Sequence, residues 1–274
     1  MKIDAYSSMA LYAEMFINGG TIPIGKGTVF TTFINSQNYL ITNWHVVTGR
    51  NADTNKPIDD GPCDPDYMEA WFFTNTIGLW LCKKINLKDK HGNNLWIEHP
   101  MGREIDVVAI PFVPKSDVYI TNLNLETASI PLKIYPSKEV SIIGYPNGLS
   151  AGGKFPIWKK GHIASEMDLN FNNKPLFLID ATTRGGMSGS PVILRESGMV
   201  ELGTSITTGT YTKFLGVYSG RLDNQSEIGR VWKPIVINEI TDNMAIPPIK
   251  PQELNETIRF ERTTSHMHNF GKKN

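Results

Sequence analysis

Short apolar runs, separated by clusters of Gly, Pro, Asn and Ser, recur along most of this 274-residue chain. The runs lie at residues 22–33, 39–42, 80–82, 105–112, 140–144, 177–179, 192–194, 200–206 and 214–219. Many short strands joined by turns are typical of an all-β barrel or sandwich. Residues 228–240 differ, because Val231, Ile235 and Ile240 recur at helical intervals and predict a short helix.

The chain is long enough to bury a sizeable core, either as one large domain or as two small ones. Residues 51–66 are rich in Asn, Asp, Pro and Gly and predict an exposed loop. Residues 246–274 open with Ile-Pro-Pro-Ile-Lys-Pro and end polar. We expect them to form a C-terminal tail without a core of its own.

Charge and hydropathy argue against several classes of partner. Lys plus Arg and Asp plus Glu number 27 each, so no excess of either sign favours nucleic acid or an anionic membrane. The apolar run at residues 107–113 is far shorter than the ~20 residues that span a bilayer. The N-terminus lacks the apolar stretch of a secretory signal. Either the protein is cytoplasmic or a signal has been removed, and Met1 favours the first.

The two cysteines, Cys63 and Cys82, have no short metal-ligand spacing to each other or to the six histidines. Two reduced structural thiols are therefore favoured over a disulfide. No metal or organic cofactor is expected.

The segment around Ser188 carries the clearest chemical signal. It reads Thr-Arg-Gly-Gly-Met-Ser-Gly-Ser-Pro-Val at residues 183–192. Amide hydrolysis requires an activated nucleophile, a base held in one tautomer and donors for the oxyanion. Glycines on both sides leave the Ser188 hydroxyl uncrowded and let the N–H groups of Gly186 and Ser188 point into one space. The alternative is a glycine-rich loop that merely turns.

Two further segments gain meaning only beside the first. His45 directly follows the apolar run at residues 39–42, and Asp106 opens the apolar run that ends at residue 112. A carboxylate at such an edge needs hydrogen-bond partners. Taken singly, a structural histidine and a strand-capping aspartate are the more common interpretations.

Together these segments resemble the trypsin-like serine peptidases, and their motifs are closest to those of the bacterial glutamyl endopeptidases. The shared patterns are Thr-Asn-x-His-Val-Val at residues 42–47, Asp106 at the start of a strand, Gly-Tyr-Pro at 144–146 and Gly-x-Ser-Gly-Ser-Pro-Val at 186–192. A strand is expected after the nucleophile, and residues 214–220 fit it. The resemblance covers roughly residues 22–240.

The resemblance implies two antiparallel six-stranded β-barrels, roughly residues 1–125 and 126–245, with the active site between them and a short C-terminal helix. It implies a serine endopeptidase that acts on polypeptides through an acyl-enzyme. Ser188 would be the nucleophile, His45 the general base and Asp106 the residue that orients the base. Gly186 and Ser188 would form the oxyanion hole.

The resemblance also implies where the substrate lies. An extended peptide would run along Ser219, Gly220 and Arg221. In the glutamyl endopeptidases, a hydroxyl residue five positions before the serine and a histidine on this strand bind the substrate carboxylate. Thr183 matches the first, whereas Tyr218 replaces the histidine and supplies one donor and no charge.

A preference for Glu before the cut is therefore not fully implied, although Arg221 near the pocket mouth could restore a positive charge. Thr182 falls at the expected pocket base, where no acid is present, so a preference for Lys or Arg is not expected. We predict a polar, acidic or small side chain. Met187 replaces the aspartate that pairs with a new N-terminus in digestive enzymes, which predicts activity without N-terminal cleavage.

Two other functional classes stay open. The first is a catalytically inactive trypsin-like module used for protein binding. The three triad residues and the glycine pair argue against it and favour an enzyme. An unrelated β-rich scaffold or capsid-associated protein would require four chance motifs in the same order.

Overall fold

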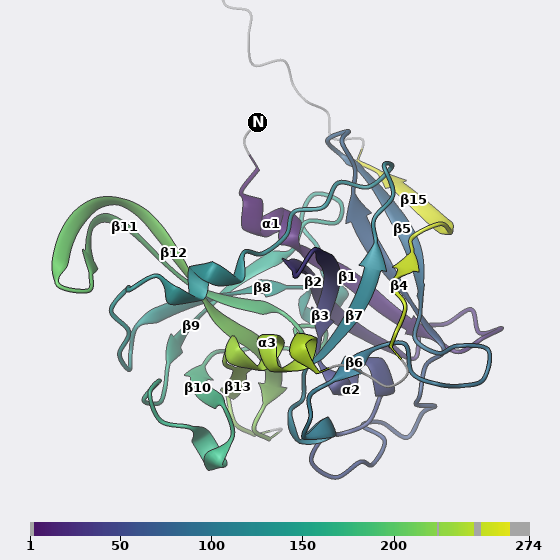
Figure 1. Cartoon of the computed structure of the whole chain (residues 1–274), viewed down its shortest axis with the longest axis horizontal. Coiled ribbons are helices and arrows are strands. Elements are labelled where there is room, and N and C mark those ends of the chain that lie inside the picture. Colours follow the sequence, from purple (N-terminus) through teal and green to yellow (C-terminus); the bar gives the residue numbers. More distant parts are fainter. Residues whose placement is uncertain (1–2, 224, 244–247, 264–274) are drawn as a thin grey trace, which may run out of the picture.

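Two β-sheets lie side by side in the computed structural model, which describes residues 3–223, 225–243 and 248–263 (Figure 1). The first sheet contains β1 (Ala10–Phe16), β2 (Gly25–Ile34), β3 (Gln37–Thr42), β4 (Tyr67–Phe73), β5 (Leu79–Asn86), β6 (Ile97–Glu98), β7 (Val108–Val113), β14 (Gln252–Glu253) and β15 (Thr257–Arg262). The second contains β8 (Glu139–Gly144), β9 (Ile157–Ile163), β10 (Leu176–Asp180), β11 (Pro191–Leu202), β12 (Ser205–Arg221) and β13 (Ile228–Trp232).

The second sheet closes into a six-stranded ring in the order β10-β13-β12-β11-β8-β9. The first sheet runs β14-β7-β3-β2-β1-β4-β5-β15, with β6 beside β7. The predicted all-β double-barrel fold with a short C-terminal helix is confirmed. The first sheet has more than the six predicted strands, because β6 and two C-terminal strands join it.

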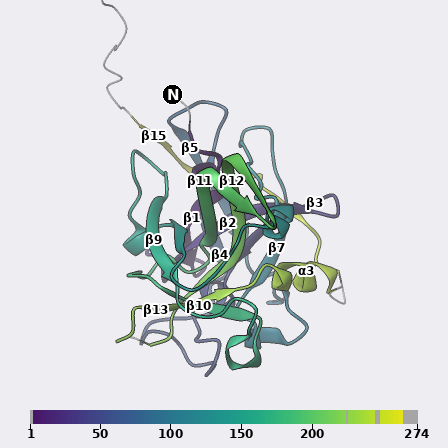
Figure 2. The same ribbon diagram turned by 90° about the vertical axis from the view of Figure 1, so that its left-hand side faces the viewer.

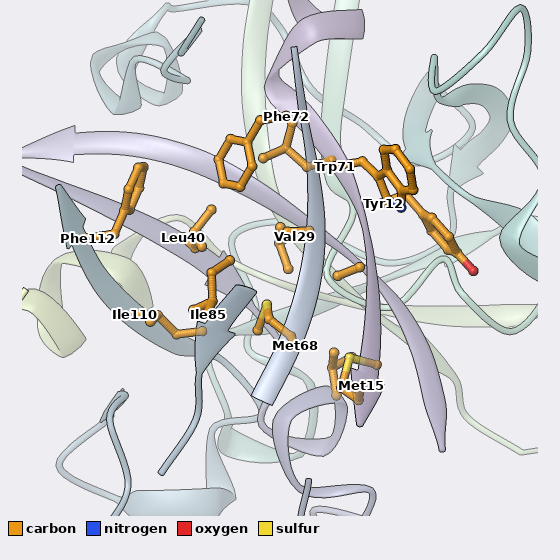
Figure 3. Packing of buried hydrophobic residues seen from close by; sticks show 14 of the residues in the cluster. Tyr12, Met15, Val29, Leu40, Met68, Trp71, Phe72, Ile85, Ile110 and Phe112 are labelled. Carbon is orange, nitrogen blue, oxygen red and sulfur yellow. The ribbon is translucent and has the colours of Figure 1, made fainter. Parts of the chain in front are cut away.

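Each sheet folds over its own apolar core. In the first, one face of the strands is apolar and packs inward (Figure 3). The buried residues include Val29, Leu40, Met68, Phe72, Ile110 and Phe112, all of them inaccessible to solvent. Burying one such side chain contributes about 1.5–3 kcal/mol, so these alternating positions determine which face of each strand turns inward.

The C-terminal segment belongs to the first sheet. Strand β15 pairs antiparallel with β5, and β14 pairs parallel with β7 (Figure 1). Arg259 on β15 forms ion pairs with Glu14 at 2.9 Å and with the buried Glu69 at 2.5 Å. Of the predicted tail, residues 246–247 and 264–274 lie outside the described residues.

The helix expected over residues 228–240 is wrong in its first half. Residues 228–232 form β13, which pairs with both β10 and β12. Helix α3 (Ile235–Asp242) begins only after Pro234, since proline cannot supply an N–H inside a helix but suits its first turn. Its buried face packs into a cluster that joins the two sheets, and Figure 2 shows the helix from another side.

The other two α-helices of the described chain are short: α1 (Ala5–Met9) and α2 (Trp44–Thr48). Within the described residues, no helix has both the length and the apolar character that crossing a membrane requires.

Candidate active site

Ser188 lies in the loop between β10 and β11, and the glycines around it are geometrically required. Gly186 has φ +89° and Gly189 has φ +86°, a region that side chains rarely adopt. A Cβ on Gly186 would collide with the carbonyl oxygen of Tyr145, and one on Gly189 with that of Thr28. The glycine pattern therefore reflects a turn that no other residue fits.

The loop leaves two N–H groups available beside the Ser188 hydroxyl. The N–H groups of Met187, Gly189 and Ser190 donate to backbone carbonyls at 3.2, 2.9 and 3.0 Å. Within the described part of the chain, the N–H groups of Gly186 and Ser188 have no such acceptor. These are the two donors that the sequence predicts for an oxyanion.

Thr28 on β2 fixes this loop from the opposite barrel. Its N–H donates to the carbonyl oxygen of Ser188 at 2.8 Å, and its hydroxyl donates to that of Gly186 at 2.8 Å. The side chain is fully buried. Thr28 has little signal in the sequence, because a hydroxyl residue beside Gly27 in an apolar strand does not indicate which residue it bonds.

His45 and Asp106 lie together where β3 ends and its neighbour β7 begins. His45 is in α2, and its Nδ1 lies 2.7 Å from Oδ2 of Asp106. The backbone N–H of His45 donates to Oδ1 of the same carboxylate at 2.9 Å. An ionised carboxylate only accepts, so it holds the ring proton on Nδ1 and leaves the Nε2 lone pair to act as a base.

Asn43 supports this pair. Its Nδ2 donates to the backbone carbonyl of Asp106 at 2.7 Å, and the Asn43 side chain is fully buried. Asp106 itself is only 4% exposed. The position of the carboxylate is thus set by contacts on both its side chain and its backbone.

A pocket of about 450 Å³ joins these parts. His45 from the first barrel and Gly186 and Ser188 from the second all line it. Its remaining walls are Met15, Ile24, Gly25, Lys26, Val46, Gly49, Ile58, Asp59, Gly61, Pro62, Asn147 and Gly185. The predicted base and nucleophile therefore face one cavity where the two barrels meet.

The strand predicted to hold the substrate passes close to the nucleophile. Gly220 has φ +90°, and a Cβ there would lie 4.0 Å from the Ser188 hydroxyl oxygen. Ser219 is 2% exposed. Arg221 lies at the end of β12, with its guanidinium 3.8 Å from the carboxylate of Glu227.

The residues predicted to line the specificity pocket are divided between interior and surface. Thr183 and Tyr218 are each 1% exposed, and their hydroxyls are hydrogen-bonded to each other. A Cβ on Gly229 would lie 2.5 Å from the Tyr218 ring, so the ring lies directly over this glycine. Burial raises the pKa of Tyr218. Thr182, by contrast, is exposed.

Charges of both signs lie near Arg221. Arg184 lies 3.7 Å and Arg221 3.8 Å from the same oxygen of Glu227. Coulombic interactions at these distances depend strongly on solvent exposure. The positive charge of Arg221, predicted at the pocket mouth, is therefore partly offset by the carboxylate of Glu227.

Across the described residues, no three His, Cys, Asp or Glu side chains are grouped so as to hold a metal ion. Cys63 and Cys82 are both free thiols there, the first half-buried and the second buried.

Comparison with known proteins matches residues 25–200, well over half of the chain, to the family described as the trypsin-like peptidase domain. A search of curated proteins found no match. Among solved structures, the active form of the Rv3671c protease from M. tuberculosis is similar at 16% identity and a TM-score of 0.51. That match covers 90% of this chain and 84% of the other. An inactive form of Rv3671c gives 15% identity and a TM-score of 0.49, covering 88% of this chain and 90% of the other. At 16% identity, the likeness to the active form shows the fold alone.

Proposed function

Because this chain belongs to the family of trypsin-like peptidase domains, we propose that it is a serine endopeptidase that forms an acyl-enzyme on Ser188. The observation that carries the proposal is the 2.7 Å contact between His45 and Asp106, at a pocket that His45 shares with Ser188. A base oriented by a buried carboxylate is what a weak hydroxyl nucleophile requires.

In the proposed mechanism, the Ser188 oxygen attacks the carbonyl carbon of the scissile bond while Nε2 of His45 takes the hydroxyl proton. The carbonyl oxygen becomes an anion and accepts hydrogen bonds from the N–H groups of Gly186 and Ser188. Asp106 stabilises the imidazolium that forms. His45 then protonates the leaving amine, and a water molecule hydrolyses the ester by the same steps.

The acyl part of the substrate would lie extended along residues 219–221. We propose that the residue before the cut has a small side chain. The Tyr218 ring lies over Gly229, and its hydroxyl is hydrogen-bonded to the hydroxyl of Thr183. Neither Tyr218 nor Thr183 therefore presents a polar group to a ligand. Of the polar, acidic and small side chains predicted from the sequence, this packing favours the small ones.

Replacement of Ser188 tests the proposal. We expect Ser188→Ala to lower kcat by on the order of 10⁶, and Asp106→Asn by on the order of 10⁴ because the tautomer is no longer fixed. A fluorophosphonate probe should label Ser188 in the unmodified protein. The matched control is Ser190→Ala, because the buried Ser190 hydroxyl has no hydrogen-bond partner in the described structure and its loss should leave activity intact.

Near-normal cleavage by Ser188→Ala would contradict the assignment. A folded protein that neither cleaves peptides nor reacts with the probe would instead support the catalytically inactive binding module.

A further inference from the structure

The pocket beside Ser188 and His45 has an apolar character that catalysis itself does not require. Its walls include the side chains of Met15, Ile24, Val46, Ile58 and Pro62. Met15 and Ile24 come from β1 and the turn before β2, whereas Ile58 and Pro62 come from the loop at residues 51–66. The cavity thus extends away from the nucleophile into the first barrel.

The direction of this extension relates it to one end of the substrate. In the proposed function, the acyl part lies along residues 219–221 of β12. None of these residues lines the cavity, whose walls come from the first barrel and from Asn147, Gly185, Gly186 and Ser188. A peptide that crosses Ser188 from β12 must continue on the opposite side. The cavity therefore lies on the side of Ser188 where the residue after the cut would be.

The absence of a side chain at Gly25 leaves room beside Met15 in the wall of the cavity. A Cβ on Gly25 would lie 3.3 Å from the terminal methyl of Met15, so a larger residue at this position would crowd the Met15 side chain. The charged residues Lys26 and Asp59 also border the space, and their opposite signs offer no net preference for a charged ligand.

Ile58 provides accessible apolar surface in this wall. It is 50% exposed, although its backbone N–H is held by a 3.0 Å hydrogen bond to the carbonyl oxygen of Gly49. The loop is further fixed by the ion pair between Arg50 and Asp64. An exposed aliphatic side chain on an anchored loop gains from burial against an apolar ligand.

We propose that this cavity binds the residue immediately after the cleaved bond and selects a large aliphatic or aromatic side chain there. The inference rests on the proposed function, since it needs an acyl-enzyme on Ser188. Because bond cleavage and amide formation are the reverse of one another at this site, an amine that attacks the acyl-enzyme must occupy the same cavity.

Acyl transfer provides a direct test. In the presence of p-nitrophenyl acetate, the Ser188 oxygen displaces p-nitrophenolate and forms an acetyl ester. An added amine then attacks this ester carbonyl, its nitrogen forming the new amide bond as the ester bond breaks and the amine proton passes through His45 to Ser188. Chromatography measures how much N-acetyl amide forms relative to acetate, with leucinamide or glycinamide as the acceptor.

We expect leucinamide to capture the acetyl-enzyme about 10–100 times more efficiently than glycinamide, the range that hydrophobic pockets achieve. Ile58→Asp should reduce this ratio at least severalfold. The matched control is Ile206→Asp, which alters an isoleucine that is 67% exposed on β12 and outside the cavity wall, and it should keep the ratio of the unmodified protein.

Equal capture of the two amines by the unmodified enzyme would overturn the inference, as would an unchanged ratio in Ile58→Asp. Both results would leave the proposed function intact, because acetyl-enzyme forms in each. If Ser188 does not displace p-nitrophenolate from p-nitrophenyl acetate, the proposed function is overturned and this inference with it.

Discussion

The hydroxyl of Thr28 donates a 2.8 Å hydrogen bond to the carbonyl oxygen of Gly186, so a strand of one barrel holds the nucleophile loop of the other. A second bond of 2.8 Å runs from the Thr28 N–H to the carbonyl oxygen of Ser188. These contacts hold the peptide units that directly follow Gly186 and Ser188, next to the two units whose N–H groups would meet the oxyanion. Thr28 is therefore a positioning residue, since it does not itself line the pocket.

We expect Thr28→Val to lower kcat by on the order of 10², the cost of misplacing a reacting group by about an ångström. KM should change little, because the substrate does not contact Thr28. The rate of labelling by a fluorophosphonate should fall in parallel. Thr32→Val is the control. Thr32 is equally buried on the same strand, but its hydroxyl donates a hydrogen bond to the carbonyl oxygen of Leu123, away from the site. Equal losses in both variants would indicate a purely structural role.

Activity should not depend on a cut near the N-terminus. Met187 is fully buried within an apolar cluster of the second barrel. Its side chain has no carboxylate with which the amine of a newly cut N-terminus could pair. Protein with Met1 intact, verified by mass spectrometry, should react with an active-site serine probe. Reaction that begins only after trimming would show that this interpretation of Met187 is wrong.

The two thiols should differ sharply in reactivity. Cys82 is fully buried, and burial raises its pKa to about 12, so little thiolate forms at neutral pH. Cys63 is half-buried, and burial also raises the pKa of its thiol. We expect Cys63 alone to react slowly with a thiol reagent in the native protein, and both to react after unfolding without reductant. Finding no thiol then would contradict a cytoplasmic location, which we propose from the sequence.

Removing the Arg259 guanidinium should destabilise the first barrel. Glu14 and Glu69 both pair with it, and Glu69 is 6% exposed, so Arg259→Met leaves a buried carboxylate without its counter-charge. The free energy of unfolding should fall by ~1–3 kcal/mol, less than for a fully buried pair because Arg259 is itself partly exposed. Arg262→Met on the same strand is the control, since no ion pair of Arg262 occurs among the described residues. Similar urea midpoints for both variants would refute this role.

Local patterns in the sequence were sufficient where the chemistry is local. The glycines around Ser188 predicted a turn that only glycine permits, and the structure contains it. The apolar run before His45 likewise corresponds to β3. The segment 228–232 was misassigned because Val231 and Ile235 satisfy helical spacing while Pro234 sets the actual boundary.

Contacts between distant segments could not be predicted in this way. The bond between Thr28 and Gly186 spans 158 positions, and that between Asn43 and Asp106 spans 63. The buried contact of Tyr218 with Thr183 is similar, because a tyrosine on an apolar strand is compatible with either a ligand contact or core packing. The packing of neighbouring strands decides between them.

The pairing of β15 with β5 joins residues 174 to 183 positions apart in the chain, with the whole second barrel synthesised between them. During synthesis, domains fold as their residues leave the ribosome, N-terminal parts first. Here the first barrel has an unpaired edge at β5, and Glu69 lacks its counter-charge, until Arg259 has been translated. His45 and Asp106 are carried by that unfinished barrel. The first barrel would thus reach its full stability only after the second barrel has been translated.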